Sequence, residues 1–435
     1  MRKILRKISV MLLLMVMLFP AFTVKAAMPV ISGSSALSFD LDTGELILTK
    51  DIDTRRYPAS ITKLLTALVF SDYYSSQKSV YLKYPKEARL EVPYSIYYNL
   101  KNIPNDEEIS ADDVMHALLL GSANDAAVVV ALNISKTIED FAVLMNEKAK
   151  SLGMENSHFV TATGIHDPDH YTTAYDLTFL LKAAYNDPWL REVASKSDYV
   201  MKSKNQTLGQ IISKNNLIGI EGNVFGKTGY TGEAGRCLVS VFVRDGRTLG
   251  TIILNSVNDP GNTEIFTSTV ILADASYLEE KVVKLSKSQE VGVINVSYRP
   301  YRFIGPTKEM EVPVLASETL SYYENDVNTA ESDVEFSYQE IAAASIREGT
   351  VIGTAVLKER QSSKSVTLLS TIDVPSKILK THLFSYIMLV IALLVIIALF
   401  LVSNINKRRR KLARKRRLAG GKRTGKFVDT HNQKF

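Results

Sequence analysis

Residues 58–69 have the sequence PASITKLLTALV, in which a serine and a lysine open an apolar segment. The proline and the spacing of the apolar residues predict a helix over 60–70. Residues three positions apart share one helical face, so the Lys63 amine lies within reach of the Ser60 hydroxyl. A lysine can activate a serine nucleophile when burial or a nearby cation lowers its pKa. A helix-capping serine followed by a solvated lysine has the same pattern, so the stretch alone leaves both interpretations open.

Two further short motifs follow along the chain. Ser122-Ala123-Asn124 lies between apolar stretches with helical spacing, where a loop can present a hydroxyl and an amide to a cleft. Lys227-Thr228-Gly229 precedes an apolar run over 237–243 that is typical of a strand. On an edge strand the lysine and hydroxyl suit a carboxylate, and the glycine lets a peptide approach as an additional strand. Each motif alone is weak, but the order S-x-x-K, S-x-N, K-T-G is specific for one group of serine acyl-enzymes.

Two predicted hairpins flank the helical part of the chain. Residues 36–50 alternate apolar and polar around Asp42-Thr43-Gly44, and residues 237–254 form two apolar runs that turn at Asp245-Gly246. Strands at both ends with helices between them predict an α+β domain, in which helices cover one antiparallel sheet. Short alternating runs over 286–375 predict a small β-rich domain. The helices are expected at 60–70, 111–120, 126–134, 140–152 and 173–185, with a last one within 263–281.

Taken together, the three motifs resemble those of the low-molecular-mass penicillin-binding proteins, the serine-type D-Ala-D-Ala carboxypeptidases. The stretches SANDAAVVVA, ATGIHDPDHYTTAYDL and GKTGYTGEAGRCLV support the resemblance, which is close over 30–285 and loose over 286–374. It implies a β-lactamase/transpeptidase-like fold. It also implies an enzyme that removes the terminal D-alanine from peptidoglycan stem pentapeptides and that β-lactams inhibit covalently.

The resemblance also implies residue roles. Ser60 would be the nucleophile and Lys63 its general base, while Ser122 would relay a proton to the leaving amine. The backbone N–H groups of Ser60 and Tyr230 would form an oxyanion hole. No metal and no organic cofactor are expected. The implied substrate-binding residues are Asn124, Lys227, Thr228, Gly229 and Tyr230.

One departure from the family pattern concerns the substrate's terminal carboxylate. Related carboxypeptidases usually have an arginine shortly after the second hairpin, and residues 255–266 contain none. An Arg–carboxylate pair is hard to replace, since two parallel hydrogen bonds hold it. Either Lys227, Thr228 and Arg236 take over this contact, or the substrate preference differs.

Two other functions are compatible with these motifs. A class A β-lactamase shares them but needs a glutamate in an E-x-x-x-N loop, and no such pattern occurs between Asn124 and Lys227. A non-catalytic peptidoglycan-binding scaffold of the same fold is the second alternative. The missing arginine favours the scaffold, whereas intact Ser60 and Lys63 count against it.

Histidine and cysteine offer little further chemistry. His166 and His170 flank an Asp-Pro-Asp segment that could be a metal site, but a polar loop before a helix is the better interpretation. Cys237, the single cysteine, begins an apolar strand and is expected to be a buried, inert thiol.

The two ends of the chain predict export and membrane attachment. Residues 1–26 combine a basic start, an apolar run over 10–19 and a small-residue cleavage site, as a secretory signal peptide does. An uncleaved anchor is the alternative. Residues 383–402 carry no charge and, as a helix, would be about 30 Å long, which matches the hydrocarbon core of a bilayer. A buried core helix is the alternative to this membrane span.

A basic tail sets the expected orientation. Nine of the eleven residues in 407–417 are basic, and such flanks remain on the cytoplasmic side. Nucleic-acid binding would also use them, but it would not explain the apolar run. Residues 27–406 have a net charge of −11, which argues against a polyanion-binding body. We therefore expect a single-pass cell-membrane protein with an extracytoplasmic catalytic domain and no nucleic-acid partner. The expected layout is a signal peptide (1–26), catalytic domain (27–285), β-rich domain (286–375), linker (376–382), transmembrane helix (383–403) and tail (404–435).

Overall fold

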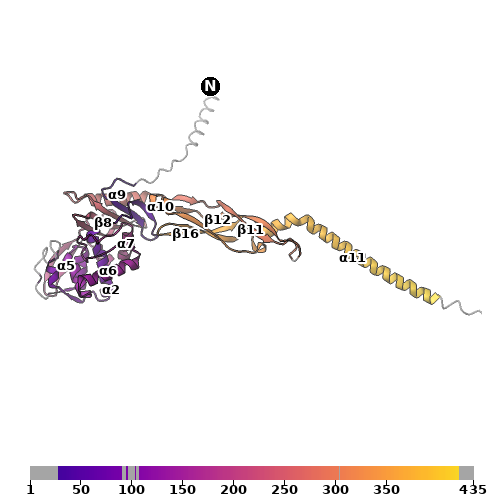
Figure 1. The fold of residues 1–435 in the computed structure, drawn as a ribbon, viewed down its shortest axis with the longest axis horizontal. Helices are drawn as coiled ribbons and strands as arrows, with labels where there is room; N and C mark the ends of the chain where they lie inside the picture. Colours follow the sequence, from indigo (N-terminus) through magenta and orange to yellow (C-terminus); the bar gives the residue numbers. More distant parts are fainter. Residues whose placement is uncertain (1–27, 91–94, 97–102, 104–106, 303, 421–435) are drawn as a thin grey trace, which may run out of the picture. The chain divides into compact units, whose positions relative to one another are not determined.

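The computed structural model describes residues 28–90, 95–96, 103, 107–302 and 304–420. The predicted signal peptide and the last part of the predicted tail, 421–435, lie outside the described residues. The chain divides into two compact units (Figure 1). The first unit contains the residues up to Leu285, with Thr319–Glu335 and Val356–Ser365, and the second contains Ser286–Glu318, Phe336–Ala355 and the residues from Val366 onward.

An antiparallel five-stranded sheet forms the frame of the first unit. Its strands, in spatial order, are β2 (Leu46–Lys50), β1 (Ser35–Asp40), β9 (Arg247–Ser256), β8 (Gly235–Arg244) and β7 (Asn223–Thr231). Both predicted hairpins are confirmed, since β1 pairs with β2 and β8 pairs with β9. The second hairpin turns at Asp245 and Gly246, whose φ angles of +49° and +77° are those that a two-residue turn requires. The K-T-G motif lies on β7, at an edge of the sheet.

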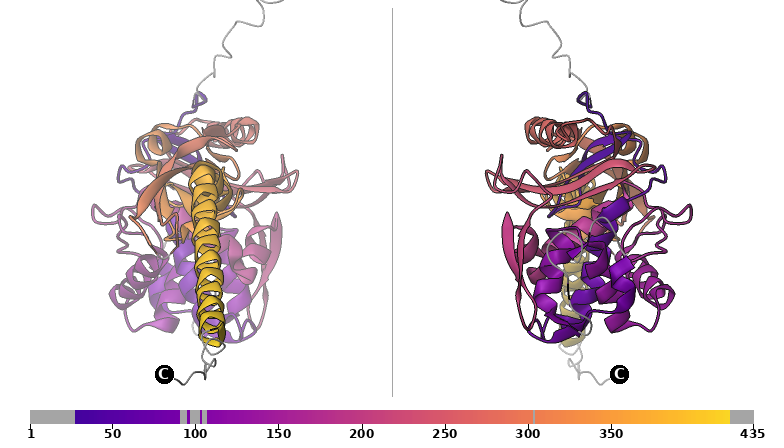
Figure 2. Two further views of the ribbon diagram at one scale, coloured as in Figure 1. Left: turned by 90° about the vertical axis from the view of Figure 1, so that its right-hand side faces the viewer. Right: turned by 90° about the vertical axis from the view of Figure 1, so that its left-hand side faces the viewer.

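Helices cover both faces of this sheet (Figures 1 and 2). On one face, α9 (Glu264–Leu278) packs against apolar residues of β8 and β9. On the other face, α2 (Thr62–Tyr74) is central: each of its residues from Thr62 to Ser71 is buried. A helix that is buried on all sides must be surrounded by other elements. Here these are α4 (Ala111–Leu119), α5 (Asn124–Ile134), α6 (Ile138–Leu152), α7 (Asp176–Asn186) and α8 (Pro188–Ala194).

The predicted α+β class and the predicted helices are confirmed, with small shifts at the ends. α7 begins at Asp176 rather than Thr173, because the Thr173 hydroxyl accepts a hydrogen bond from the Asp176 amide at 3.0 Å and so caps the helix. The sequence prediction lacked α8 and several short elements. These are the 3₁₀ turns η1 (Ala59–Ile61) and η2 (Lys86–Leu90), the strands β3 (Tyr81–Lys83) and β4 (Glu108–Ser110), and the hairpin of β5 (Asp198–Lys202) and β6 (Thr207–Ile212).

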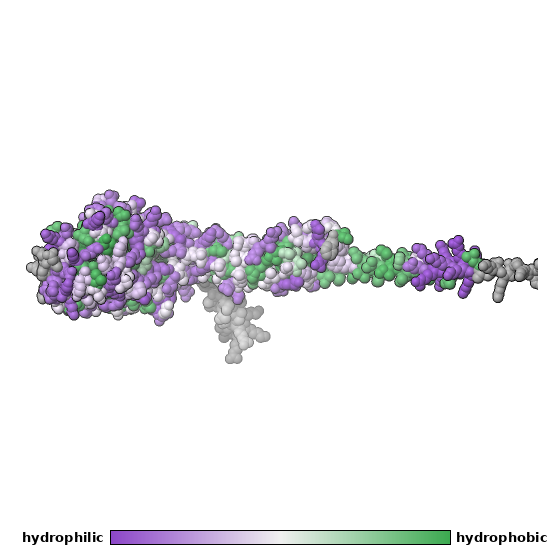
Figure 3. Space-filling view, turned by 90° about the horizontal axis from the view of Figure 1, so that it is seen from below, coloured by the Kyte–Doolittle hydropathy of each residue, from purple (hydrophilic) through white to green (hydrophobic). Residues whose placement is uncertain are grey.

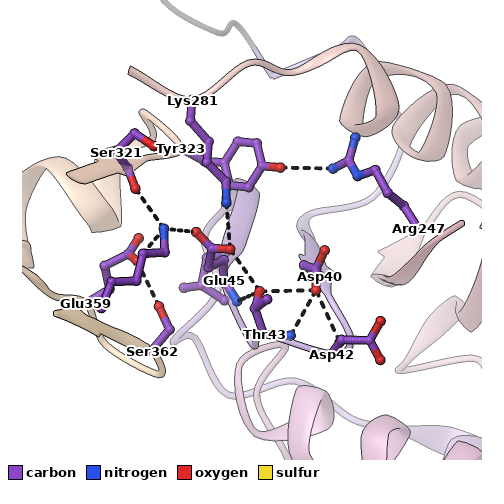
Figure 4. Close-up of polar contacts among 12 residues, drawn as sticks. Asp40, Asp42, Thr43, Glu45, Arg247, Lys281, Ser321, Tyr323, Glu359 and Ser362 are labelled. Carbon is purple, nitrogen blue, oxygen red and sulfur yellow. Dashed lines mark hydrogen bonds and ion pairs between the residues drawn. The ribbon is translucent and has the colours of Figure 1, made fainter. Parts of the chain in front are cut away.

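A buried carboxylate joins distant segments within the first unit (Figure 4). The Glu45 side chain is 1% exposed and accepts from Lys281 Nζ at 2.9 Å and from Lys364 Nζ. Burial opposes ionisation of Glu45, but the two lysines outweigh it and hold its pKa below the ordinary value. Nearby, the Asn325 side chain donates to the backbone oxygen of Leu46 at 3.0 Å. These contacts explain why 319–335 and 356–365 belong to the first unit. The first unit also contains β10 (Val282–Leu285), β13 (Leu320–Tyr322) and α10 (Asp326–Glu331).

A second five-stranded sheet lies within the region predicted to be β-rich. Its strands, in spatial order, are β11 (Glu290–Tyr298), β12 (Lys308–Ala316), β16 (Ser363–Ser370), β15 (Val351–Lys358) and β14 (Asp333–Tyr338). The turn η3 (Ala343–Ser345) adds Ala343 to a small apolar core, which also contains Val312 and Ile346.

The long helix α11 (Val374–Gly420) ends the described chain. It contains the predicted linker 376–382, the uncharged run and the basic segment 407–417 without a break. Figure 3 shows the apolar band of this helix followed by a hydrophilic one. Among the described residues, this is the one helix long and apolar enough to cross a membrane.

Candidate active site

The S-x-x-K pair has the geometry that the sequence predicts. Lys63 Nζ lies 2.9 Å from Ser60 Oγ, one helical turn away. The same nitrogen donates to Asn124 Oδ1 at 2.8 Å and to the backbone oxygen of Thr163 at 2.7 Å. Lys63 is fully buried, whereas Ser60 is only partly buried. The amine is therefore fixed on the protein side of the hydroxyl, and the hydroxyl is reachable from outside.

The S-x-N and K-T-G motifs meet on the same side of Ser60. Lys227 Nζ donates to Ser122 Oγ at 2.8 Å, although 105 residues separate them, and to the backbone oxygen of Thr228 at 3.0 Å. Lys227 is 1% exposed. Burial, followed by the charges of Lys63 and Lys214, lowers the pKa of Lys227 well below its ordinary value. The site thus holds two buried amines, each against a serine hydroxyl.

The glycine of K-T-G lets the edge strand approach Ser60 closely. A Cβ atom at Gly229 would lie 2.8 Å from the backbone oxygen of Pro58 and 3.2 Å from the backbone nitrogen of Ser60. Such contacts are closer than van der Waals packing allows, so a side chain would push β7 away from η1. Glycine is required here because two backbones touch.

Two residues of the site have a strained backbone. Ala59, which precedes Ser60, and Ser122 have φ angles of +47° and +56°, in the left-handed region that non-glycine residues rarely adopt. Residues held in this way cost about 1–3 kcal/mol each and persist when the surroundings fix them. The Ser60 and Ser122 hydroxyls each contact a buried lysine.

A cavity of about 100 Å³ opens over these groups. Its lining includes the predicted residues Ser60, Ser122, Thr228, Gly229 and Tyr230. The other three predicted residues contact this lining or one another. Lys63 Nζ contacts both Ser60 Oγ and Asn124 Oδ1, and Lys227 Nζ contacts Ser122 Oγ. Two other lining residues were considered in the sequence prediction: Arg236 as a possible carboxylate contact and Cys237 as an inert thiol. The sequence prediction assigned no role to Lys214, Asn262, Ile265 and Phe266, which also line the cavity.

Arg236, which lines the cavity, is held by contacts with Tyr230 and Asn258. Its guanidinium carbon lies 4.2 Å from the ring centroid of Tyr230. Its Nε donates to Asn258 Oδ1 at 2.9 Å, and the Asn258 amide donates to the Tyr230 hydroxyl at 3.0 Å. The stretch in which the family usually has an arginine instead contributes Asn262 to the cavity. Only the pairing of β7 with β8 brings Arg236 there, opposite Tyr230.

His170 contacts the first residue of α2. Its Nδ1 accepts from the backbone nitrogen of Val160 at 3.1 Å, so the proton of the neutral ring is on Nε2, which donates to Thr62 Oγ1 at 2.8 Å. Burial, partly opposed by Asp167, lowers the pKa of His170 to about 4. The described residues contain no group of three His, Cys, Asp or Glu side chains that could hold a metal. Cys237 is buried, and burial raises the pKa of its thiol to about 12.

Comparison with known proteins identifies the family. Residues 22–258, more than half of the chain, match the profile of a peptidase family described as D-alanyl-D-alanine carboxypeptidase. The chain belongs to this family. It is thus a serine-type peptidase of the penicillin-binding group, as the three motifs predict.

Two curated relatives carry related names. The chain is 26% identical to the D-alanyl-D-alanine carboxypeptidase DacF of Bacillus subtilis over 328 residues, which cover 75% of this chain and 81% of DacF. It is 31% identical to a D-alanyl-D-alanine endopeptidase of Escherichia coli over 238 residues, which cover 53% of this chain and 74% of the relative.

A solved structure supports the fold. Penicillin-binding protein 5 of Haemophilus influenzae matches with a TM-score of 0.57 at 20% identity, over 79% of this chain and 98% of that chain. The predicted β-lactamase/transpeptidase-like fold is therefore confirmed.

Proposed function

We propose that Ser60 is the acylated nucleophile of this D-alanyl-D-alanine carboxypeptidase and that Lys63 is its general base. The supporting observation is that Lys63 Nζ lies 2.9 Å from Ser60 Oγ and donates to the carbonyl oxygens of Asn124 at 2.8 Å and Thr163 at 2.7 Å. A neutral lysine amine has two N–H bonds and one lone pair. With N–H bonds donated to the two carbonyl oxygens, the lone pair can accept the Ser60 proton.

In the first step, Ser60 Oγ attacks the carbonyl carbon of the penultimate D-alanine while its proton moves to Lys63 Nζ. The resulting ammonium can donate to Ser60 Oγ and to the carbonyl oxygens of Asn124 and Thr163. The carbonyl electron pair moves onto oxygen, where the backbone N–H groups of Ser60 and Tyr230 would stabilise it. Loss of one such donor typically costs about 10²–10³ in rate.

In the second step, the peptide C–N bond breaks and the terminal D-alanine leaves as an amine. The leaving nitrogen needs a proton, and the Ser122 hydroxyl, which accepts a hydrogen bond from Lys227 Nζ at 2.8 Å, donates it. The proton that Lys63 took from Ser60 then restores the Ser122 hydroxyl, which leaves Lys63 neutral. Water then attacks the ester, gives its proton to neutral Lys63, and Ser60 recovers that proton as the ester bond breaks. No cofactor enters either step.

Arg236 is our candidate for binding the substrate's terminal carboxylate. It lines the cavity that exposes Ser60, and Tyr230 and Asn258 fix its plane. Its Nε is already occupied, which leaves the terminal nitrogens as a fork for a carboxylate. Thr228, on the same cavity wall, adds a hydroxyl. The carboxylate would thus be held from β8 and β7.

We further propose that the substrate is the peptidoglycan stem pentapeptide and that β-lactams acylate the same serine. The chain would act outside the cytoplasmic membrane, with α11 as its anchor and 407–417 inside. The expected layout, from a cleaved 1–26 to a tail over 404–435, belongs to this proposal. Protease treatment of intact and lysed cells tests it, because only lysis should expose the tail.

Fluorescent penicillin tests the acylation proposal. Wild-type full-length protein should be labelled, and Ser60→Ala should not be labelled. Release of D-alanine from a pentapeptide then tests the reaction. Labelling of Ser60→Ala would show that another residue is the acylated nucleophile and would contradict the proposal. Wild-type protein that neither labels nor releases D-alanine would also contradict it and would favour the non-catalytic scaffold.

An endopeptidase activity is the second candidate, because a relative with 31% identity has that name. Hydrolysis of a cross-linked peptide dimer, measured beside the pentapeptide, separates the two. Faster cleavage of the dimer would assign the endopeptidase reaction to this site.

A further inference from the structure

The second unit contains an open groove of about 790 Å³. Its walls come from the end of β11, from the chain around η3 and from the first turns of α11. Three arginines, Arg299, Arg302 and Arg347, line it together with apolar residues of α11. No carboxylate is among the described residues that line the groove. The lining of the groove therefore combines cationic and apolar side chains.

Aromatic residues mark the level of the groove along α11. The Tyr386 hydroxyl donates to the backbone oxygen of Pro300 at 2.8 Å, and the Tyr386 ring packs edge-on against Tyr301 at 5.8 Å. The Tyr298 hydroxyl lies 3.1 Å from His382 Nε2. Tyrosines with one apolar and one polar end gather where a membrane meets water.

The uncharged run of α11 begins at Leu383, between these aromatic contacts. Ile378 and Leu379, which line the groove, precede Leu383 by about 6–8 Å along the helix axis at 1.5 Å per residue. The polar layer of a bilayer extends about 5–8 Å beyond each side of the hydrocarbon core. If α11 spans the membrane, the groove lies at the depth of the lipid headgroups.

Two of the arginines are positioned by the protein. Arg347 Nη1 donates to the backbone oxygen of Ala344 at 2.9 Å, and its Nε lies 3.4 Å from the Asp373 carboxylate. Arg299 Nε lies 3.3 Å from Thr307 Oγ1, its hydrogen-bond acceptor. Guanidinium groups remain charged and bind phosphate oxygens with paired hydrogen bonds.

We propose that this groove binds the phosphodiester headgroup of an anionic phospholipid from the outer leaflet. The arginines would hold the phosphate, and Ile378 and Leu379 would contact the glycerol and the upper acyl chains. A lipid fits better than a free phosphate, because much of the lining is apolar, Ile378 and Leu379 included, and the groove is lined in part by the helix that contains the uncharged run. The bound lipid would fix how the second unit meets the membrane surface.

Native mass spectrometry of the full-length protein tests the proposal, with micelles that contain equal amounts of phosphatidylglycerol and phosphatidylcholine. Wild-type protein should retain phosphatidylglycerol at least five-fold more often. Arg299→Gln/Arg347→Gln should lose this preference. Lys377→Gln/Lys380→Gln is the matched control, since it removes two charges from α11 outside the groove lining and should keep the preference.

Folding is checked separately by fluorescent penicillin labelling of the first unit and by thermal unfolding. If the double variant unfolds, Arg299→Gln alone takes its place, because the Arg299 side chain is exposed, and it should at least halve the preference. Equal retention of both lipids by wild-type protein would overturn the proposal, as would equal losses in the arginine and lysine variants. Displacement of the lipid by millimolar glycerol 3-phosphate would show a free-phosphate site and overturn it as well.

Discussion

The two units use cations in opposite ways. In the catalytic cleft, Lys63 and Lys227 are 0% and 1% exposed and hold their amines against serine hydroxyls. In the groove beside α11, arginines face solvent. Burial lowers the pKa of Lys227, whereas a guanidinium stays charged wherever it lies. Burial of a lysine therefore suits proton transfer, and exposure of an arginine suits the binding of an anion.

Replacement of Lys63 by arginine tests whether proton transfer needs a lysine at this buried position, and it should have the largest effect. The charge remains, but a guanidinium does not give up its proton, so acylation of Ser60 should slow by about 10³-fold. Stopped-flow acylation with a fluorescent penicillin measures the rate. Lys150→Arg, on an exposed position of α6, is the control and should acylate normally. A Lys63→Arg rate within ten-fold of wild type would exclude Lys63 as the base.

His170 extends the comparison to a buried group that stays neutral. The unfolded chain binds a proton near pH 6.5, but folded His170 does so only near pH 4. Between these values the unfolded state holds more protons, so the stability of the fold should decrease as the pH falls. The full effect is about 3 kcal/mol.

Urea unfolding of wild type and His170→Asn at pH 7.5, 6 and 4.5 measures this effect. Asparagine keeps an acceptor but does not titrate in this range, so its stability should decrease less at low pH. Parallel pH profiles for the two proteins would show that His170 is not the group responsible.

The fit between β7 and η1 gives the next test. In Gly229→Ala the new methyl group would lie 2.8 Å from the Pro58 carbonyl oxygen, so the strand must shift away from Ser60. A displacement of this kind typically costs about 10² in rate. Gly232→Ala, in the turn that follows β7, is a matched control, because its Cβ would meet no atom within 4 Å. The rates of acylation by penicillin are measured for both variants. Equal rates would show that the close approach of β7 to η1 at Gly229 is not needed for acylation of Ser60.

The smallest effect should come from replacement of Arg236, a partly buried cation that lines the cavity over Ser60. Arg236→Gln should raise KM for a pentapeptide about ten-fold, through loss of a charged hydrogen bond of roughly 1.5 kcal/mol. A C-terminally amidated pentapeptide has no carboxylate and should show no change in KM between variant and wild type. Arg236→Lys should recover part of the loss. An increase in KM of the same size for both peptides would point to distortion rather than carboxylate binding.

Local patterns in the sequence predicted much of the fold. The hairpin turn at Asp245-Gly246 was predictable, since few residues adopt its φ values, and so was α2, since its apolar run needs burial. The short α8 and the β5–β6 hairpin have weak local signals and are stabilised by their packing. Inclusion of 319–335 and 356–365 in the first unit was not predictable, because it depends on contacts such as those of Glu45 with Lys281 and Lys364.

The Ser60–Lys63 pair follows from local geometry, because a helix places residues three apart on one face, and the apolar length of α11 follows from composition. The groups that contact these elements depend on how the whole chain packs. Lys227 reaches Ser122 across 105 residues, Arg236 enters the cavity by strand pairing, and the arginine groove gathers three separate segments. The reason is physical: local geometry follows from bond rotations and periodicity, whereas contacts between distant residues exist only once the chain has packed.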